Sequence, residues 1–500
     1  MPATEPATET PIVRAERPQT FASRFVFLTI CVAVVMTTLA FGTVHYWALA
    51  VFSVSATLIV CFGVVDAWTL RSVRISLNPL QWPLVGLILL ALAQLLPLRA
   101  VAPHTAGLPV SPSLALSLDP YATRLFIVQV TALLIYFGAT LIFTDSPERL
   151  RLLVRTIIIF GFLLAIFGLT QSFATGSSRV YWFRELTQST AFGPFINRHH
   201  FAGYMELTIA LPLGLLFSGA VERDQRALYA FAAALMGVGL ILTNSRGGLI
   251  SLGAEIIFLA IVAGVGSKHS RHRSPGAGAR AAMMRAGLAF GLVAVLIGGA
   301  LYLGGSDAFS RLLGTPTAAD PTTGRAHFWN VTLDIIKAHP WVGTGLGAFG
   351  VVYTRYDSHN GLFRLEQAHN DYLQILSDGG IVGAVLGLVF VVILFRKGFA
   401  RRETDDRFRR GVTTGALAGC FAVLVHSFFD FTLHTTANAL LFLIMAGIAT
   451  QDTRVDKPVR RHRRRRRHSH SHDQALAAAP EEPQALTSAE AGRVSRDGMV

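Results

Sequence analysis

The sequence predicts an all-α, polytopic membrane protein with about 12 transmembrane helices and one long loop between spans 9 and 10. Hydrophobic residues make up 52% of the 500 residues and charged residues only 15%, whereas soluble domains usually have about 25% charged residues. The apolar residues come in long runs, and the charges, which sum to a net +14, are clustered between and after those runs. This distribution excludes an ordinary water-soluble enzyme, a disordered scaffold and a disulfide-rich secreted protein.

A transmembrane helix needs roughly 20 mostly apolar residues. Windows of that length predict spans near residues 25–42, 46–66, 80–98, 122–143, 151–171, 200–218, 226–243, 247–266, 284–304, 372–395, 411–432 and 434–451. These segments are too long and too apolar for strands of a membrane barrel, which alternate over about ten residues. The first span lacks a convincing cleavage site and leads directly into the second, so we expect it to be retained.

The placement of Lys and Arg predicts the orientation of the chain. With the N-terminus inside, the inside connections and both termini hold 33 of the 44 basic residues, and the outside connections hold the other 11. Both termini are therefore expected in the cytoplasm. The expected organisation is a cytoplasmic segment, spans 1 to 9, an outer loop with short helices, spans 10 to 12, and a basic tail, at residues 1–24, 25–304, 305–371, 372–451 and 452–500.

The outer connections contain the most informative sequence. In the long loop, Phe328, Val331 and Ile335 recur at helical spacing, and His339-Pro340 is expected to end that helix. The segment Gly343–Gly350 (GTGLGAFG) superficially resembles a phosphate-binding loop. It lacks the Lys-Ser/Thr of a P-loop and does not follow a strand, which favours a tight turn over a nucleotide site.

Three outer residues, Arg246, Arg325 and His369, suggest chemistry when they are taken together. Singly, each has an ordinary explanation: an arginine at a helix end reaches the headgroups, a loop arginine is solvated, and an interfacial histidine forms hydrogen bonds. The predicted topology places all three on one side. Arginine binds phosphate bidentately, and a histidine can take a proton from a hydroxyl near neutral pH. Two cations that bind phosphate and a base that takes a hydroxyl proton suit the transfer of a group from a phosphate-activated donor to an alcohol.

Four ionisable residues are expected inside or near the ends of spans: Glu206, Glu255, His426 and Asp430. Such groups are costly in a membrane and usually face a cavity or a partner. A functional role and a purely structural pairing, for example of Glu206 with an outer arginine, are both open.

The order of these motifs resembles the O-antigen ligase and polymerase superfamily over roughly residues 190–450. The motifs are Phe192–His200 (FGPFINRHH), Ser245–Gly248 (SRGG), Gly324-Arg325, His339–Gly345 (HPWVGTG), Ala368–Tyr372 (AHNDY) and Phe428–Leu433 (FFDFTL). Each motif is short, but their order, spacing and sidedness make the set fairly specific.

The resemblance implies an inverting glycosyltransferase of the GT-C type in the bacterial inner membrane, with its site and the loop 305–371 on the periplasmic side. Such enzymes take a glycan from an undecaprenyl diphosphate carrier. Ligases place it on lipid A-core, and polymerases place it on another lipid-linked repeat. Arg246 and Arg325 would contact the diphosphate, and His369 would be the general base. Further candidate substrate-binding residues are Asn197, Arg198, Glu206, His339, Asn370, Asp371 and Asp430.

No metal or other cofactor is expected for such an enzyme. Acidic residues on the outer side leave a metal-dependent site open, but the outer loops contain no Asp-x-Asp pair, which argues against one. These acidic residues are Asp307, Asp320, Asp357, Glu366 and Asp371.

Residues 452–500 are expected to be a disordered cytoplasmic tail. Its basic run, Arg460–His472 (RRHRRRRRHSHSH), should attract anionic lipid headgroups, and no nucleic-acid partner is expected because no recognition fold accompanies it. A different class of function, a transporter of an anion or of a lipid-linked intermediate, is compatible with twelve spans that carry embedded carboxylates. A transporter should show two corresponding broken spans, and the sequence shows none.

Overall fold

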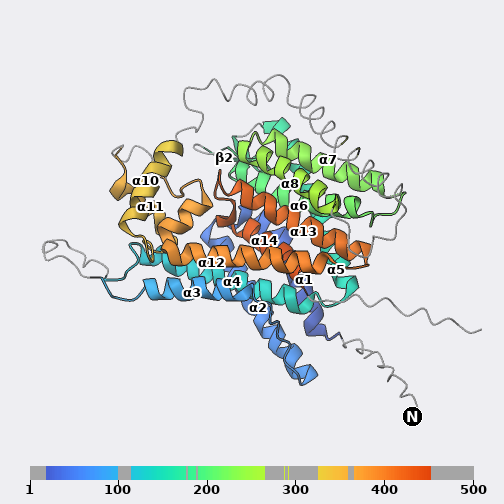
Figure 1. The fold of residues 1–500 in the computed structure, drawn as a ribbon, viewed down its shortest axis with the longest axis horizontal. Helices are drawn as coiled ribbons and strands as arrows, with labels where there is room; N and C mark the ends of the chain where they lie inside the picture. Colours follow the sequence, from blue (N-terminus) through green and yellow to red (C-terminus); the bar gives the residue numbers. More distant parts are fainter. Residues whose placement is uncertain are drawn as a thin grey trace, which may run out of the picture. The chain divides into compact units, whose positions relative to one another are not determined.

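The computed structural model of the chain describes residues 19–99, 114–175, 178–186, 190–264, 325–358 and 365–451, and the isolated residues 287 and 291. These residues all belong to one unit, residues 1–455, and a second unit, residues 456–500, lies outside the described ranges. The described part is helical apart from a short two-stranded antiparallel hairpin (Figure 1). The all-α membrane fold is therefore confirmed.

The elements follow one another along the chain as α1 (Phe21–Leu39), η1 (Phe41–Thr43), α2 (Tyr46–Leu70), α3 (Gln81–Gln94), α4 (Pro120–Phe143), α5 (Pro147–Thr175), β1 (Arg179–Val180), β2 (Arg184–Glu185), α6 (Arg198–Ser218), α7 (Arg226–Leu242), α8 (Arg246–Gly264), α10 (Arg325–Ala338), α11 (Phe349–Tyr356), α12 (Asp371–Arg402), α13 (Arg407–His426), η5 (Thr432–His434) and α14 (Thr436–Thr450).

The predicted spans overlap these helices, except the one near 284–304, which falls on residues outside the described ranges. By length and apolar composition, seven described helices can cross a membrane, namely α1, α2, α4, α5, α6, α12 and α13. The apolar helices α3, α7 and α14 are shorter. The chain is thus a multi-pass membrane protein. The total of twelve spans, the orientation of the termini and the character of the tail 452–500 remain predictions.

The eleventh span is shorter than the sequence predicts, and the difference places Asp430 outside the helix. The predicted span 411–432 includes Asp430, but α13 ends at His426. The amides of Phe429 and Asp430 both bond to the carbonyl of His426, and the Asp430 carboxylate then accepts from the amide of Phe431 at 2.9 Å. Asp430 therefore lies in the turn between α13 and η5, where its side chain competes for backbone groups.

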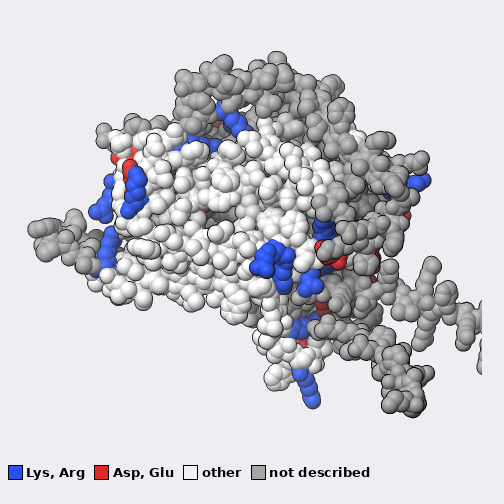
Figure 2. Space-filling view, viewed as in Figure 1, with Lys and Arg blue, Asp and Glu red and all other residues white. Residues whose placement is uncertain are grey.

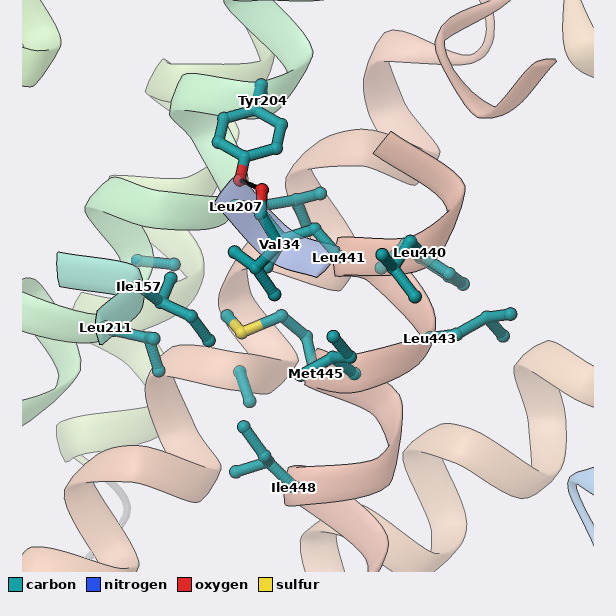
Figure 3. Close-up of a cluster of buried hydrophobic side chains, with 14 of the residues drawn as sticks. Val34, Ile157, Tyr204, Leu207, Leu211, Leu440, Leu441, Leu443, Met445 and Ile448 are labelled. Atoms are coloured by element: carbon teal, nitrogen blue, oxygen red, sulfur yellow. Dashed lines mark hydrogen bonds between the residues drawn. The ribbon is translucent and has the colours of Figure 1, made fainter. Parts of the chain in front are cut away.

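The helix α6 lies at the centre of the packing, and most of its residues are buried. Figure 3 shows its side chains Tyr204, Leu207 and Leu211 beside residues of α1, α5 and α14. The Tyr204 hydroxyl donates to the carbonyl of Val34 in α1 at 3.1 Å. Since α6 also carries Glu206, this packing holds a carboxylate inside the bundle.

The helices α6 and α13 approach each other through small residues. Glycines recur every fourth position of α13 at Gly411, Gly415 and Gly419, a spacing that favours close helix contact in membranes. A Cβ on Gly415 would lie 2.4 Å from the carbonyl oxygen of Ala210 in α6, and one on Gly214 would lie 2.5 Å from the amide of Gly415. Only glycine permits this backbone contact, which sets the distance between Glu206 on one helix and His426 on the other.

A buried ion-pair network ties α2 to the junction of α4 and α5. Arg74 pairs with Asp66 at 3.2 Å and with Asp145 at 2.9 Å, and Arg149 pairs with Asp145 at 3.1 Å. Arg149 also donates to the hydroxyl of Ser23 in α1 at 2.7 Å. Arg74 and Arg149, which the predicted topology assigns to the inside connections, are thus part of the packing.

The surface crossed by α12 lacks charged side chains over most of its length (Figure 2). The exposed side chains of α12 include the apolar residues Val382, Val385, Leu388 and Val392. In Figure 2 the Lys and Arg side chains gather toward the ends of this face. An apolar band between charged ends is the pattern expected for helices in contact with lipid.

The α6–α13 contact gives the first prediction. Gly415→Ala should lower the free energy of unfolding by about 1–3 kcal/mol because a new methyl group would overpack a backbone contact. Thermal unfolding of the purified protein in detergent measures the loss. Gly387→Ala in α12 is the matched control, since nothing lies within 4 Å of its Cβ position. Equal melting temperatures for the two variants would contradict the assignment.

Candidate functional site

The candidate site lies where four helices begin. Asn197 caps α6, and its side chain accepts from the amide of His199 at 2.9 Å. Ser245 precedes α8, and its hydroxyl accepts from the amide of Gly248 at 3.2 Å. Arg325 is the first residue of α10, and Asn370 caps α12. Asp430 contacts Arg325 of α10 and His369 just before α12, and it lies near His199 in the first turn of α6. Ser245 contacts the same histidine, His199, at 2.8 Å, so these segments meet in one region.

Asp430 is the hub of the site. Its side chain is 1% exposed, and one oxygen accepts from the Arg325 guanidinium at 3.1 Å while the other lies 3.2 Å from Nδ1 of His369. His199 Nδ1 is 3.7 Å from the first oxygen. Burial alone would raise the pKa of Asp430, but the hydrogen bond from His369 and the charges of His199, His369 and Arg325 bring that pKa well below its usual value. The carboxylate thus bonds to Arg325 and His369 and lies close to His199, which brings three segments of the chain together.

His369 is held in an unusual backbone conformation, with φ of +51°. This left-handed region is disfavoured for side chains with a Cβ, so neighbouring contacts must impose it. The Trp329 indole of α10 donates to the carbonyl of Ala368 at 3.1 Å, and the His369 ring lies 4.9 Å from that of Phe431. The side chain is 24% exposed. Its Nε2 makes no hydrogen bond to the described residues.

The loop before α12 is bonded to the turn after α13, which fixes His369 relative to Asp430. The amide of Asp371 donates to the carbonyl of Ser427 at 2.9 Å, and the Asn370 side chain donates to that of Phe428 at 3.1 Å. The Asp371 carboxylate accepts from the Ser427 hydroxyl at 2.7 Å and bonds to His434 at 2.9 Å. Two predicted substrate-binding residues, Asn370 and Asp371, therefore hold the loop in place in this structure.

Beneath Asp430 a second set of polar groups extends into the bundle. Glu206 and His426 are fully buried and are joined at 2.8 Å through Nδ1 of the imidazole. The other nitrogen of His426 lies 3.5 Å from the hydroxyl of Ser245, which is 2.8 Å from Nδ1 of His199. The partner of Glu206 is therefore a histidine and not an outer arginine. Glu255 is also buried.

The arginines Arg198 and Arg246 are the first residues of α6 and α8. Arg246 is exposed and directly follows Ser245. The next residue, Gly247, packs on the His426 ring, because a Cβ there would lie 2.7 Å from Cδ2 of the imidazole. Arg246 therefore extends from the rim of the same cluster that contains His426.

His339 lies at the other end of α10 from Arg325, about 20 Å away for a helix of this length. It lies 3.3 Å from the Tyr356 hydroxyl of α11, and no described contact links it to Asp430. The structure brings the other predicted residues to the site or its rim but not His339, whose role stays a prediction.

The glycine-rich segment Gly343–Gly350 serves as a docking loop for α12. Its amides are already bonded: Thr344 to the carbonyl of Ser377 at 2.9 Å, Gly345 to the carbonyl of Asp378 at 3.0 Å, Leu346 to the Gln94 side chain at 2.9 Å and Gly347 to the Asp378 carboxylate at 3.1 Å. The helix is broken nearby at Gly380, with φ of +62°. Amides used in this way cannot cradle a phosphate, which supports the tight-turn interpretation.

Three histidines of the site were not among the predicted site residues. His199 was noted only within the motif Phe192–His200, His426 only as an embedded charge, and His434 not at all. The signal that could have found them is proximity to other motif residues, since His199 follows Arg198 and His434 follows Asp430 by four positions. Within the described ranges, no three His, Cys, Asp or Glu side chains are grouped so as to hold a metal ion.

Comparison with known proteins bears on this region directly. Residues 231–388 match the family model described as O-antigen ligase. The matched segment contains Arg246, Arg325 and His369, and its end precedes Asp430. No curated protein matches the chain. The family match confirms the resemblance to the O-antigen ligase and polymerase superfamily.

The His434–Asp371 pair gives a pH-dependent prediction. Burial would lower the pKa of His434, but the hydrogen bond and the charge of Asp371 raise it above the ordinary value of 6.5. A raised folded-state pKa stabilises the protein fully below pH 6.5, and this contribution is lost as the pH rises through the folded pKa. The difference in melting temperature between the wild type and His434→Gln should therefore be largest near pH 6 and shrink toward pH 9.

Asp371→Asn is the control for this series. Without the carboxylate the pKa of His434 is no longer raised, so a further His434→Gln change should give a difference that does not fall between pH 6 and 9. If the wild-type difference is constant with pH, the pair does not carry a proton in the folded protein.

Proposed function

From an O-antigen ligase domain at residues 231–388 of a multi-pass membrane protein, we propose that the chain is an inverting glycosyltransferase. It moves a glycan from an undecaprenyl diphosphate carrier to a hydroxyl acceptor at the periplasmic face of the bacterial inner membrane. The family supports a membrane glycosyltransferase of the ligase or polymerase type. The donor, the acceptor and the roles of single residues are our proposal, and the observation that carries it is the meeting of His369 and Arg325 on Asp430.

His369 is the general base. Asp430 accepts the hydrogen on Nδ1, so Nε2 keeps its lone pair, on a side chain that is 24% exposed. Nε2 takes the proton of the acceptor hydroxyl as that oxygen forms a bond to the anomeric carbon of the donor. The ionised Asp430 stabilises the resulting imidazolium, as a carboxylate does in other base–carboxylate pairs. Such a positioned base contributes typically 10²–10⁴-fold to the rate.

The leaving group is the lipid diphosphate, and the bond between its oxygen and the anomeric carbon breaks as the acceptor bond forms. A single displacement of this kind inverts the anomeric centre. The electron pair remains on the diphosphate, whose growing charge needs cations at fixed positions. Arg325, anchored on Asp430, and Arg246 at the start of α8 supply them. The proton goes to His369, so no metal is needed to activate the hydroxyl.

The first test is transfer by the purified protein in liposomes. The donor is the lipid-linked glycan extracted from host cells that lack this protein, and the acceptor is lipid A-core from the same cells. Wild-type protein should join the two, and His369→Ala should be slower by at least 10²-fold. In cells, a gel of surface polysaccharide should show the same loss at a normal protein level.

The products separate the alternatives. Glycan on lipid A-core identifies a ligase, and longer lipid-linked glycan identifies a polymerase. Movement of donor across the liposome membrane without any transfer would identify a transporter. Normal surface glycan with His369→Ala would remove the proposed base.

The arginines give a separate prediction. Arg325→Lys and Arg246→Gln should each reduce the transfer rate by about 10²–10³-fold, the size seen when one fixed donor to a developing anion is removed. Lysine in place of Arg325 keeps the charge but not the planar, bidentate geometry. Arg355→Gln in α11 is a control outside the cluster. Equal activities for all three variants would contradict diphosphate contacts by Arg246 and Arg325.

A further inference from the structure

We propose that His199 is a second substrate-facing histidine of the site. A buried chain of hydrogen bonds from Glu206 through His426 and Ser245 fixes its Nε2 as an acceptor for a hydroxyl group of the glycan. The inference rests on the proposed function for the class of ligand. It concerns a residue that lies outside the segment 231–388 matched by the family model.

The chain of contacts is continuous. Glu206 Oε1 lies 2.8 Å from Nδ1 of His426, whose Nε2 lies 3.5 Å from the hydroxyl of Ser245. The same hydroxyl lies 2.8 Å from Nδ1 of His199. Glu206, Ser245 and His426 are all fully buried, so water does not compete for these bonds in the described structure.

The hydroxyl of Ser245 determines which imidazole donates. A serine hydroxyl has one hydrogen to donate and two lone pairs. The amide of Gly248 donates to it at 3.2 Å and so uses one lone pair. With two imidazole nitrogens also in contact, every group is satisfied only if one imidazole donates to Ser245 and the other accepts from it.

Carboxylates at both ends of the chain select one direction. Glu206 attracts a hydrogen onto Nδ1 of His426, which leaves Nε2 of that ring to accept from Ser245. Asp430, 3.7 Å from Nδ1 of His199, favours a hydrogen on that atom. In the opposite direction, the bare lone pair of His199 Nδ1 would face the Asp430 carboxylate. His199 therefore carries its hydrogen on Nδ1 and donates it to Ser245.

Nε2 of His199 is then an acceptor on a partly exposed side chain. The side chain is 19% exposed, and Nε2 makes no hydrogen bond within the described part of the chain. As a hydrogen-bond acceptor, Nε2 binds a group that donates a hydrogen. A diphosphate offers only acceptor oxygens, whereas a sugar offers hydroxyl groups. His199 therefore fits the glycan next to the Arg325–Asp430–His369 cluster.

Close packing holds the side chains of this hydrogen-bonded relay, Glu206–His426–Ser245–His199, in place. The His426 ring lies against the backbone of Gly247, and Glu206 and His426 stand on the two helices that meet at Gly415. Because the His426 ring is held in place, it can favour one tautomer of His199 through Ser245, which a mobile side chain could not do. Glu206, His426 and Ser245 are positioning residues in this scheme, and His199 alone touches the substrate.

The transfer assay tests the relay with matched serines of α8. Ser245→Ala should lower kcat/KM by about three- to tenfold, the value of one hydrogen bond, whereas Ser245→Thr should retain most activity because it keeps the hydroxyl. Ser251→Ala is the control, since Ser251 is equally buried but bonds only to the carbonyl of Gly247. Glu206→Gln, which keeps an acceptor for His426, should be more active than Glu206→Met. Equal activity of the two alanine variants would overturn the relay.

Chemical modification tests the substrate contact without relying on transfer. Diethyl pyrocarbonate acylates accessible imidazole nitrogens that carry a lone pair, and mass spectrometry locates the adduct. His199 should be modified at neutral pH and the buried His426 should not. The extracted lipid-linked glycan should protect His199, and undecaprenyl diphosphate without sugar should not.

The two readouts separate the two claims. Protection of His199 by the glycan donor in a protein that transfers nothing would support the binding role and remove the proposed reaction. Active transfer with His199 unprotected by the donor would overturn the binding role and leave the reaction intact. Equal protection by the sugar-free carrier would also overturn it, because His199 would then face the diphosphate.

Discussion

The site depends on one buried carboxylate, that of Asp430, and on the way its charge is balanced. A carboxylate at the end of a membrane bundle is costly unless donors surround it, and removal of one partner from a buried pair typically costs about 3–5 kcal/mol. Here the donors come from α10 and the loop before α12, and His199 of α6 lies nearby at 3.7 Å. Balancing Asp430 therefore brings His199, Arg325 and His369 together. The arrangement of these three side chains follows from satisfying the carboxylate, in the same contacts that stabilise this end of the fold.

The positive helix ends reinforce this arrangement. The first turns of α6, α8 and α12 each leave backbone amides directed out of the helix, and each of these helices begins with or just after a residue of the cluster. Asn197, Ser245 and Asn370 satisfy some of these amides locally. These three helix ends, together with Arg198, Arg246 and Arg325, favour an anion in this region. A leaving diphosphate would gain from that field as its charge grows, whereas a neutral acceptor sugar would not.

Sequence patterns predicted the helices well and the contacts only in part. Apolar runs of membrane length are read directly from composition, and the helix that starts at Arg325 and ends before His339 follows from its spacing and its proline. The grouping of Arg246, Arg325 and His369 followed from predicted sidedness. The partners of single side chains were harder to predict, because pairing depends on how each helix is rotated about its axis. Glu206 meets His426 rather than an arginine only because Gly214 and Gly415 bring α6 and α13 into backbone contact, and no one-dimensional pattern reports that rotation. His339, chosen from a motif, lies a full helix length away from Arg325.

Asp430 and His369, unlike Glu206 and His426, lie outside regular helices. A span interior has no spare backbone groups and no water, so Glu206 and His426 are held there against each other. Asp430 and His369 occupy a turn and a loop, where backbone amides and an unusual φ angle are available to aim their side chains. The bonds between residues 370–371 and 427–428 make these two irregular segments as firmly placed as helices. Helices therefore carry Arg246 and Arg325 at their described starts, the irregular segments carry His369 and Asp430, and the buried Glu206–His426 pair contacts the cluster through Ser245.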